Sequence, residues 1–133
     1  MKIDSLNPPG LPRNRAYSQG VRASGAGCTI YVGGQNGIGP DGSVVSQQIG
    51  EQTTRALQNV ELVLAESGAS LGDVAFWTIQ IVEGQQLGAA FAAFQAVWGD
   101  RPNPPAVSVA FVSGLASPSF LVEITAVAVL PGD

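Results

Sequence analysis

One carboxylate lies where an acid–base catalyst could be placed. Glu123 belongs to the segment 120–130, whose other residues are almost all apolar. Burying a carboxylate is costly unless it is hydrogen-bonded, so a buried glutamate in such a segment needs a specific environment. A carboxyl group held in this way can pass a proton to a nitrogen atom and orient a water molecule. The alternative is a structural carboxylate that accepts hydrogen bonds from backbone N–H groups at a subunit boundary.

The composition limits what other chemistry is possible. The chain has no histidine, which excludes Ser-His-Asp and Cys-His nucleophiles and every histidine-ligated metal. A single cysteine, Cys28, excludes an internal disulfide and a cysteine-cluster metal site, and we expect it to be a small core residue. Catalysis would therefore depend on carboxylates, arginine, tyrosine, backbone groups, water or a bound cofactor. We predict no metal and no cofactor.

The charge and hydropathy patterns restrict the partners. The net charge is −4 with six basic residues, which argues against a nucleic-acid surface. No apolar stretch of about 20 residues could span a membrane, and the first dozen residues, polar and rich in proline, are unlike a signal peptide. We expect a soluble, cytoplasmic protein that binds neither nucleic acid nor a membrane.

A single α/β domain over residues 1–133 must position these groups. The order of elements is β-β-α-β-α-β-β, and the first two strands read as a hairpin closed by a glycine turn at 24–27. Glycine and proline between residues 33 and 43 predict a loop. The predicted strands are 17–23, 28–32, 71–82, 106–112 and 120–130, and the predicted helices are 49–67 and 87–98.

Each predicted helix has one apolar stripe at helical spacing. Two such helices can cover one face of a sheet. The stripe of the first comprises Ile49, Ala56, Leu57, Val60, Val63 and Leu64, and that of the second Leu87, Phe91, Phe94 and Trp98.

The last predicted strand is apolar on both faces. Val122, Ile124 and alternate residues after them point one way, and Leu121, Val127 and Val129 point the other. A strand with two apolar faces needs cover on both sides, and the chain has no third layer to supply it. We therefore predict an oligomer that packs through the uncovered face of the sheet.

Four segments, in this order and spacing, resemble the reactive intermediate deaminase family, also called the Rid or YjgF family. Some of its members carry an older name as L-PSP endoribonucleases. The resemblance extends from about Leu11 to Leu130. The segments are Ala16-Tyr17-Ser18-Gln19-Gly20-Val21, Tyr31-Val32-Gly33-Gly34-Gln35, the helix with its exit over 51–74, and Pro104-Pro105-Ala106 followed by the closing strand 121–128.

The resemblance implies a chorismate-mutase-like two-layer α+β fold, with a mixed sheet and two helices on one face. It also implies a homotrimer with small-molecule pockets between subunits. The reaction typical of the family is the addition of water to an imine or enamine, which releases ammonia.

The resemblance also assigns five positions to the pocket. Glu123 matches the acidic residue of the closing strand, and we expect it to lie beside Tyr17 of the same or an adjacent chain. Gly33 stands where active members often have serine, Phe91 about where they have asparagine, and Val107 where they have the arginine that binds the substrate carboxylate. The alternative for Tyr17 is an ordinary strand tyrosine. For Phe91 its spacing favours core packing.

These departures predict a pocket that is more apolar and less cationic, which disfavours 2-aminoacrylate and other small imino acids. Replacement of the missing cation by Arg101, Arg13 or Arg15 is a lesser alternative. The predicted function is hydrolytic deamination of an imine, an enamine or a related small molecule. The alternative is a trimeric protein of the same fold that binds a small molecule without turnover, and the acidic charge argues against a nuclease.

Overall fold

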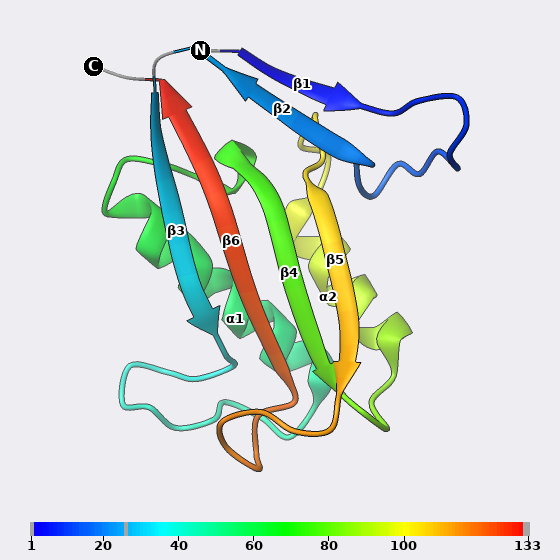
Figure 1. Ribbon diagram of the computed structural model, residues 1–133. Coiled ribbons are helices and arrows are strands. Elements are labelled where there is room, and N and C mark those ends of the chain that lie inside the picture. The colour runs from blue at the N-terminus through cyan, green and yellow to red at the C-terminus, as the bar shows by residue number, and fades with distance from the viewer. Residues whose placement is uncertain (1, 26, 132–133) are drawn as a thin grey trace.

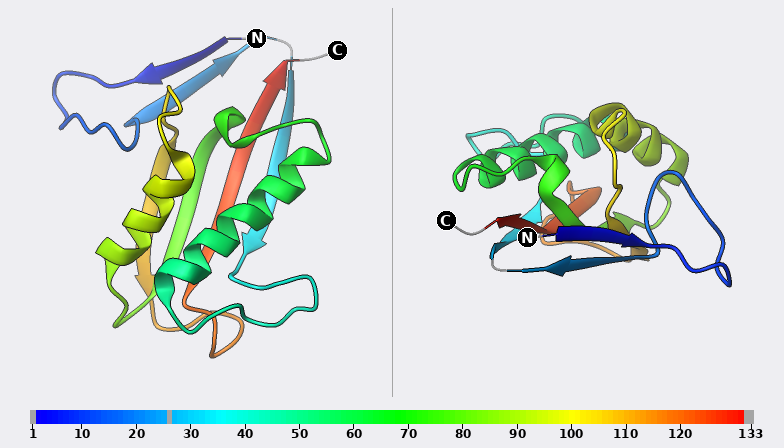
Figure 2. Two further views of the ribbon diagram at one scale, coloured as in Figure 1. Left: turned by 180° about the vertical axis from the view of Figure 1, so that it is seen from behind. Right: turned by 90° about the horizontal axis from the view of Figure 1, so that it is seen from above.

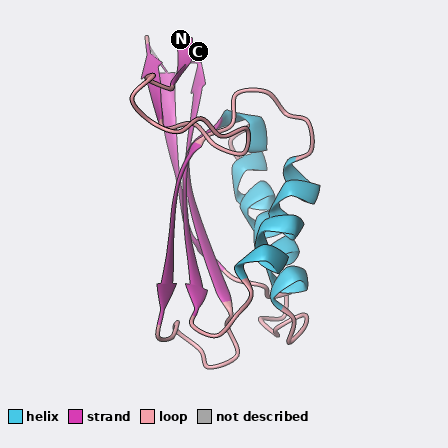
Figure 3. Cartoon of the chain, turned by 90° about the vertical axis from the view of Figure 1, so that its right-hand side faces the viewer, coloured by secondary structure: helices cyan, strands magenta, loops and turns pink. Residues whose placement is uncertain are grey.

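A four-stranded sheet with both helices on one face forms the body of the molecule (Figures 1 and 3). The computed structural model describes residues 2–25 and 27–131. The strands run in the order β3-β6-β4-β5. The elements are β1 Lys2–Leu6, β2 Gly20–Ser24, β3 Gly27–Gln35, α1 Ile49–Ala65, β4 Val74–Val82, α2 Leu87–Trp98, β5 Ala106–Val112 and β6 Val122–Pro131, with a 3-10 turn at Leu71–Asp73.

The sheet is mixed, as predicted. β4 and β5 are parallel, whereas β6 is antiparallel to both of its neighbours, β3 and β4. Antiparallel neighbours can be joined by short turns, but a parallel pair needs a crossover. Here α2 provides the crossover from β4 to β5, and both helices lie on the same side of the sheet (Figure 2). The predicted α+β class and two-layer arrangement are confirmed.

Helix α1 buries the predicted stripe against the sheet. Ala56, Val60 and Leu64 have no exposed surface, whereas Val63 is 36% exposed because it lies at the edge of the stripe. The helix ends before Gly68, whose φ is +74°. The N–H groups of Gly68 and Ala69 donate to the carbonyls of Ala65 and Leu64, so the last turn is closed by backbone bonds.

Helix α2 packs on α1 and stands off from the strands beneath it. Of its predicted stripe, Trp98 is buried, but Leu87 and Phe91 are 45% and 49% exposed. The expectation that Phe91 is a core residue is therefore wrong. Ala90 is the residue that α2 buries near its middle, which leaves the larger side chains at a rim.

The N-terminal strands pair differently from the prediction. β2 pairs antiparallel with β1, a strand that the sequence analysis did not identify, and β3 pairs with β6 (Figure 1). The predicted 17–23/28–32 hairpin is therefore wrong, and Ala26 of its turn lies outside the described residues. Lys2–Leu6 is short and has no regular alternation of polar and apolar residues, so its sequence does not identify it as the partner of Gly20–Ser24.

The sheet face opposite the helices has no helix over it (Figure 3). Tyr31 is 78% exposed there and Phe76 40%, while Val127 and Val129 of β6 are half-buried. β6 thus has apolar side chains on both faces, but only one face is covered within the chain. Cys28, expected in the core, is exposed at the start of the edge strand β3.

Candidate functional site

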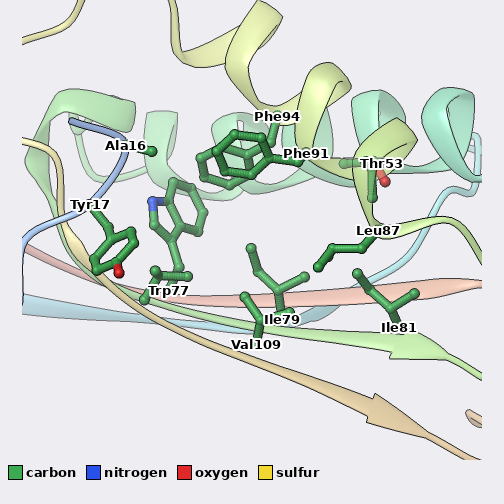
Figure 4. Close-up of a pocket in the computed structure, with 13 residues that line it drawn as sticks. Ala16, Tyr17, Thr53, Trp77, Ile79, Ile81, Leu87, Phe91, Phe94 and Val109 are labelled. Atoms are coloured by element: carbon green, nitrogen blue, oxygen red, sulfur yellow. The ribbon is translucent and has the colours of Figure 1, made fainter. Parts of the chain in front are cut away.

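A cavity of about 400 Å³ lies between α2 and the strands β4 and β5 (Figure 4). Three predicted site residues line it. Tyr17 comes from the segment before β2, Phe91 from α2 and Val107 from β5. Because Leu87, Phe91 and Val109 are about half exposed, the cavity opens to the surface along the rim of α2.

The register of two parallel strands forms the floor of the cavity. Trp77 of β4 is paired with Val107 of β5, and Ile79 with Val109. Paired residues share a face of the sheet, so these four side chains point together toward α2. The rings of Trp77 and Phe94 meet edge to face, with centroids 5.3 Å apart and planes at 83°, which fixes the indole under the helix.

The cavity wall is almost entirely apolar. Thr53 contributes a hydroxyl, but its Oγ1 already donates to the carbonyl of Ile49 at 2.8 Å. The other polar groups are the Tyr17 hydroxyl and the indole N–H of Trp77. None of the lining residues within the described chain is charged. A ligand anion would lose its water here without gaining a cationic partner.

A second hollow adjoins the cavity, and two arginines line it. It shares Ala16 and Phe91 with the cavity and is lined by Arg15 and Arg101. Arg101 is already engaged: its Nη1 donates to the carbonyls of Val97 and Trp98 at 2.8 and 2.7 Å. Its guanidinium also lies 5.8 Å from the centre of the Trp98 ring. Arg15 and Arg13 are exposed, and Arg13 lines neither hollow.

Glu123 lies on the opposite face of the sheet. It is paired with Gln80 across β4 and β6, while its neighbours Val122 and Ile124 point toward the helices. Asn36 Nδ2 lies 3.5 Å from Oε1 of Glu123. The half-buried carboxyl group also packs on Gly34, where a Cβ would lie only 2.6 Å from Glu123 Cδ. A side chain at position 34 would therefore require the Glu123 carboxyl group to move.

The structure therefore divides the five predicted residues into two clusters. Tyr17, Phe91 and Val107 lie together in the cavity under α2. Glu123 lies on the open face of the sheet, beside the glycine pair of β3, and Gly33 has open space where a side chain would be. Within one chain, Glu123 and Tyr17 do not share a cleft.

A buried polar network links the second cluster to α1. Gln52 has no exposed surface; its Nε2 donates to the carbonyls of Ser46 and Ser119, and its Oε1 accepts from the Leu121 N–H. Asn59 Nδ2 donates to the carbonyls of Asn36 and Ile38. These bonds fix the glycine-rich loop and the start of β6, and hence the position of Glu123.

The sequence analysis did not single out Gln52, Asn59 or Trp77. Gln52 and Asn59 are seven residues apart, two helical turns, so both belong to the buried face of α1. Polar residues within a buried stripe require hydrogen-bond partners, and that is the signal that could have identified them. The role of Trp77 depends on the β4–β5 register, which the sequence does not show.

One titratable group in the loop has a perturbed pKa. The Ser43 N–H and hydroxyl both bond to the Asp41 carboxylate, at 2.9 and 3.0 Å, and these bonds lower the pKa of Asp41.

No group of three or more metal-ligating side chains occurs within residues 2–25 and 27–131. None of the helices in that part of the chain is long and apolar enough to cross a membrane.

The sequence of this chain is similar to those of several known proteins. A family model described as "Endoribonuclease L-PSP" matches residues 11–130. A RutC family protein of Pyrococcus abyssi is 34% identical over 95 residues, covering 70% of this chain and 72% of the relative. The mitochondrial protein mmf1 of Schizosaccharomyces pombe is 30% identical over 105 residues. That match covers 79% of this chain and 62% of the relative.

A solved structure extends the similarity to almost the whole fold. The structure of YyfB from Yersinia pestis, described as a protein of unknown function of the conserved Rid protein family, superposes with a TM-score of 0.87 at 28% identity. The match covers 98% of this chain and all of that one.

Proposed function

The chain belongs to the Endoribonuclease L-PSP family, which includes the Rid and YjgF proteins, and from this premise we propose that it is a hydrolytic deaminase. Its substrate is an imine or enamine, bound in pockets between the subunits of a homotrimer. The family membership and the two clusters of site residues support this proposal.

In the proposed reaction, water adds to the carbon of a C=N bond. The water loses a proton to the Glu123 carboxylate as its oxygen forms the new C–O bond. The carboxyl group then returns that proton to the nitrogen, which gives a carbinolamine. The same group next moves the proton of the carbinolamine hydroxyl to the nitrogen as the C–N bond breaks, and the products are a ketone or aldehyde and ammonia. An enamine first takes a proton on carbon to become the imine. One carboxyl group can carry out these transfers because it acts alternately as a base and as an acid.

The separation of the clusters is the observation that carries the shared-site proposal. Glu123 is fixed on the open sheet face by Gly34 and Asn36, and the cavity with Tyr17 and Val107 opens on the other side of the sheet, along α2. A second copy that packs on the open face would bring its own cavity rim to Glu123. The same contact would cover Tyr31 and Phe76.

The cavity wall favours a substrate without a small, exposed carboxylate. Val107 offers a branched apolar surface where the family resemblance implies an arginine. Arg101 is held by backbone carbonyls, which leaves Arg15 as the other arginine that lines the adjoining hollow. A neutral or aromatic imine loses little on entering such a cavity.

The family's endoribonuclease description is not carried over to this chain. The net charge is −4, and six basic residues in 133 do not form a phosphate-binding stripe. The cytoplasmic location expected from the sequence remains part of the proposal.

Ammonia release is the test of the function. Imines would be generated in place by a flavin-dependent amine oxidase acting on an arylalkylamine such as benzylamine, with oxygen as the oxidant, and the ammonia measured with and without the protein. We expect Glu123→Gln to lower the rate by roughly 10²–10⁴-fold, because the amide keeps the shape but can neither accept nor return a proton. Glu66→Gln, an exposed change just after α1, is the matched control and should leave the rate unchanged. Equal rates for wild type and Glu123→Gln would contradict the proposal.

A further inference from the structure

Trp77 has a hydrogen-bond donor that nothing in the described chain accepts. Its side chain is 1% exposed, and its Nε1 atom is buried without a hydrogen-bond partner. Buried polar groups in folded proteins nearly always have a partner, so an unpaired indole N–H needs an explanation. The other tryptophan follows the rule: Trp98 Nε1 donates to the carbonyl of Arg101 at 3.1 Å.

The unpaired donor belongs to the wall of the apolar cavity. Figure 4 shows the Trp77 indole under Phe94 and Phe91, with its nitrogen on the side of the ring that faces Ala16 and Tyr17. Of the lining residues, Tyr17 and Thr53 carry a hydroxyl group, and the Thr53 hydroxyl donates to the carbonyl of Ile49. Among the described residues, the indole N–H is thus the buried side-chain donor of the cavity wall that has no partner.

We propose that the cavity binds an uncharged, mainly apolar molecule with one hydrogen-bond acceptor, which pairs with Nε1 of Trp77. The acceptor is a carbonyl oxygen or an imine nitrogen. This inference rests on the proposed function in that it takes the cavity as the ligand site, and it adds the ligand class and the residue that recognises it. It does not require turnover.

The acceptor reaches Nε1 when the segment carrying Ala16 and Tyr17 moves aside. That segment belongs to no helix or strand. The Ala16 N–H donates a hydrogen bond to the side-chain oxygen of the nearby Asn14. It is anchored at Ser18, whose N–H and hydroxyl bond to the carbonyls of Pro105 and Pro104. A small displacement before Ser18 therefore breaks no tertiary hydrogen bond.

Two probes of similar shape test the proposal: acetophenone, which has a carbonyl acceptor, and isopropylbenzene, which has none. With ¹⁵N-labelled protein, the two indole N–H signals are followed during titration. We expect acetophenone to move the Trp77 signal downfield and isopropylbenzene not to do so. The Trp98 signal should stay in place with both probes, because its N–H is already bonded.

The affinities of the two probes provide a second measurement. Their ratio is insensitive to a change of cavity size that affects both probes. Trp77→Phe removes the donor, and we expect it to raise the ratio of the acetophenone Kd to the isopropylbenzene Kd by about tenfold. Trp98→Phe is the matched control and should leave the ratio unchanged. Comparing ratios keeps the test valid even though Trp77→Phe enlarges the cavity for both probes.

A third probe, benzoate, tests the charge of the ligand. We expect benzoate to bind at least tenfold more weakly than acetophenone, since no cation lines the cavity. Benzoate binding as tight as the ketone, and lost in Arg15→Gln, would overturn the proposal in favour of an anionic ligand. An unchanged ratio in Trp77→Phe, or equal shifts of Trp77 with both neutral probes, would overturn it as well. Ketone binding as expected with no ammonia release from any imine would contradict the deaminase function alone.

Discussion

At the scale of single residues, we expect Val107 to decide which ligands the cavity accepts. It lines the floor beside Trp77, in a wall without charged side chains. An arginine–carboxylate bond contributes roughly 1.5–3 kcal/mol as a charged hydrogen bond. Without that bond, a bound carboxylate is desolvated and unpaired, so the residue type at position 107 sets the charge of the preferred substrate.

We expect 2-aminoacrylate and small imino acids to be hydrolysed poorly. The missing bond alone lowers binding by roughly 10- to 100-fold, before any loss of orientation at the reacting carbon. Coupled assays with enzymatically generated imino acids, run beside an arginine-containing relative, measure this directly. Hydrolysis comparable to the relative would point to a compensating cation, and Arg15→Gln would then be the first variant to examine.

A second residue-scale prediction concerns Asp41. Two hydrogen bonds from Ser43 hold its pKa below the ordinary value, so the bonds stabilise the loop above that ordinary pKa, and their contribution is lost as the pH falls through the lowered value. Ser43→Ala removes the hydroxyl but keeps the N–H. We expect the pKa of Asp41 to rise part of the way back, as measured by ¹³C carboxyl NMR titration. Ser46→Ala, whose hydroxyl accepts from the Gln48 N–H, should not move it.

At the scale of elements, the buried side chain of Gln52 joins the long loop before α1 to the start of β6. Gln52 makes three hydrogen bonds, to Ser46, Ser119 and Leu121, from a fully buried position. We expect Gln52→Leu to lower the free energy of unfolding by about 2–3 kcal/mol, because the Leu121 N–H and two carbonyls lose their partner. Urea unfolding measures the change. Gln58→Leu, on the exposed side of the same helix, should change stability by less than about 0.5 kcal/mol.

The helices were predictable because their signal is local. The 3.6-residue periodicity and the glycines at 68 and 99 predicted α1 and α2 to within two residues, and the prolines before Ala106 marked the start of β5. Strand pairing is not local, since the partner of β2 is decided by competition between β1 and β3. The sequence pattern contains no information about that competition, which is why the hairpin prediction was wrong.

The candidate site was predictable as a set of residues but not as an arrangement. The family resemblance selected Tyr17, Phe91 and Val107, and the structure brings these three together. Side chains of β6 alternate between the two faces of the sheet, so Glu123 points away from these three residues. This direction can be inferred only when the face of β6 that the helices cover is known. The cavity and the exposure of Phe91 both result from the distance between α2 and the sheet. The apolar stripe of the helix does not predict that distance.

At the scale of the whole molecule, the open sheet face predicts an oligomer, and the family resemblance implies that it is a homotrimer. Its apolar side chains include Tyr31, Phe76 and Val127, too many for a monomer in water. We expect sedimentation equilibrium at micromolar concentration to give three times the chain mass of 13.6 kDa. Val127→Glu on the open face should yield monomers, whereas Leu62→Glu, on the exposed side of α1, should not. A monomeric wild type would contradict both the interface and the shared site.

Subunit mixing tests whether the catalytic site is shared between chains. Glu123→Gln breaks one cluster and Tyr17→Ala the other, so trimers of either variant alone should release little ammonia. If each site takes Glu123 from one chain and Tyr17 from its neighbour, trimers re-formed from an equal mixture contain intact sites at about a quarter of the positions, by random assortment in a cyclic ring. We therefore expect the mixture to regain up to about a quarter of the wild-type rate. A control mixture of Glu123→Gln with the double variant should regain none, because no chain in it supplies the glutamate. Failure to regain activity, in trimers whose exchange is verified by mass spectrometry, would contradict a site that takes Glu123 from one chain and Tyr17 from its neighbour.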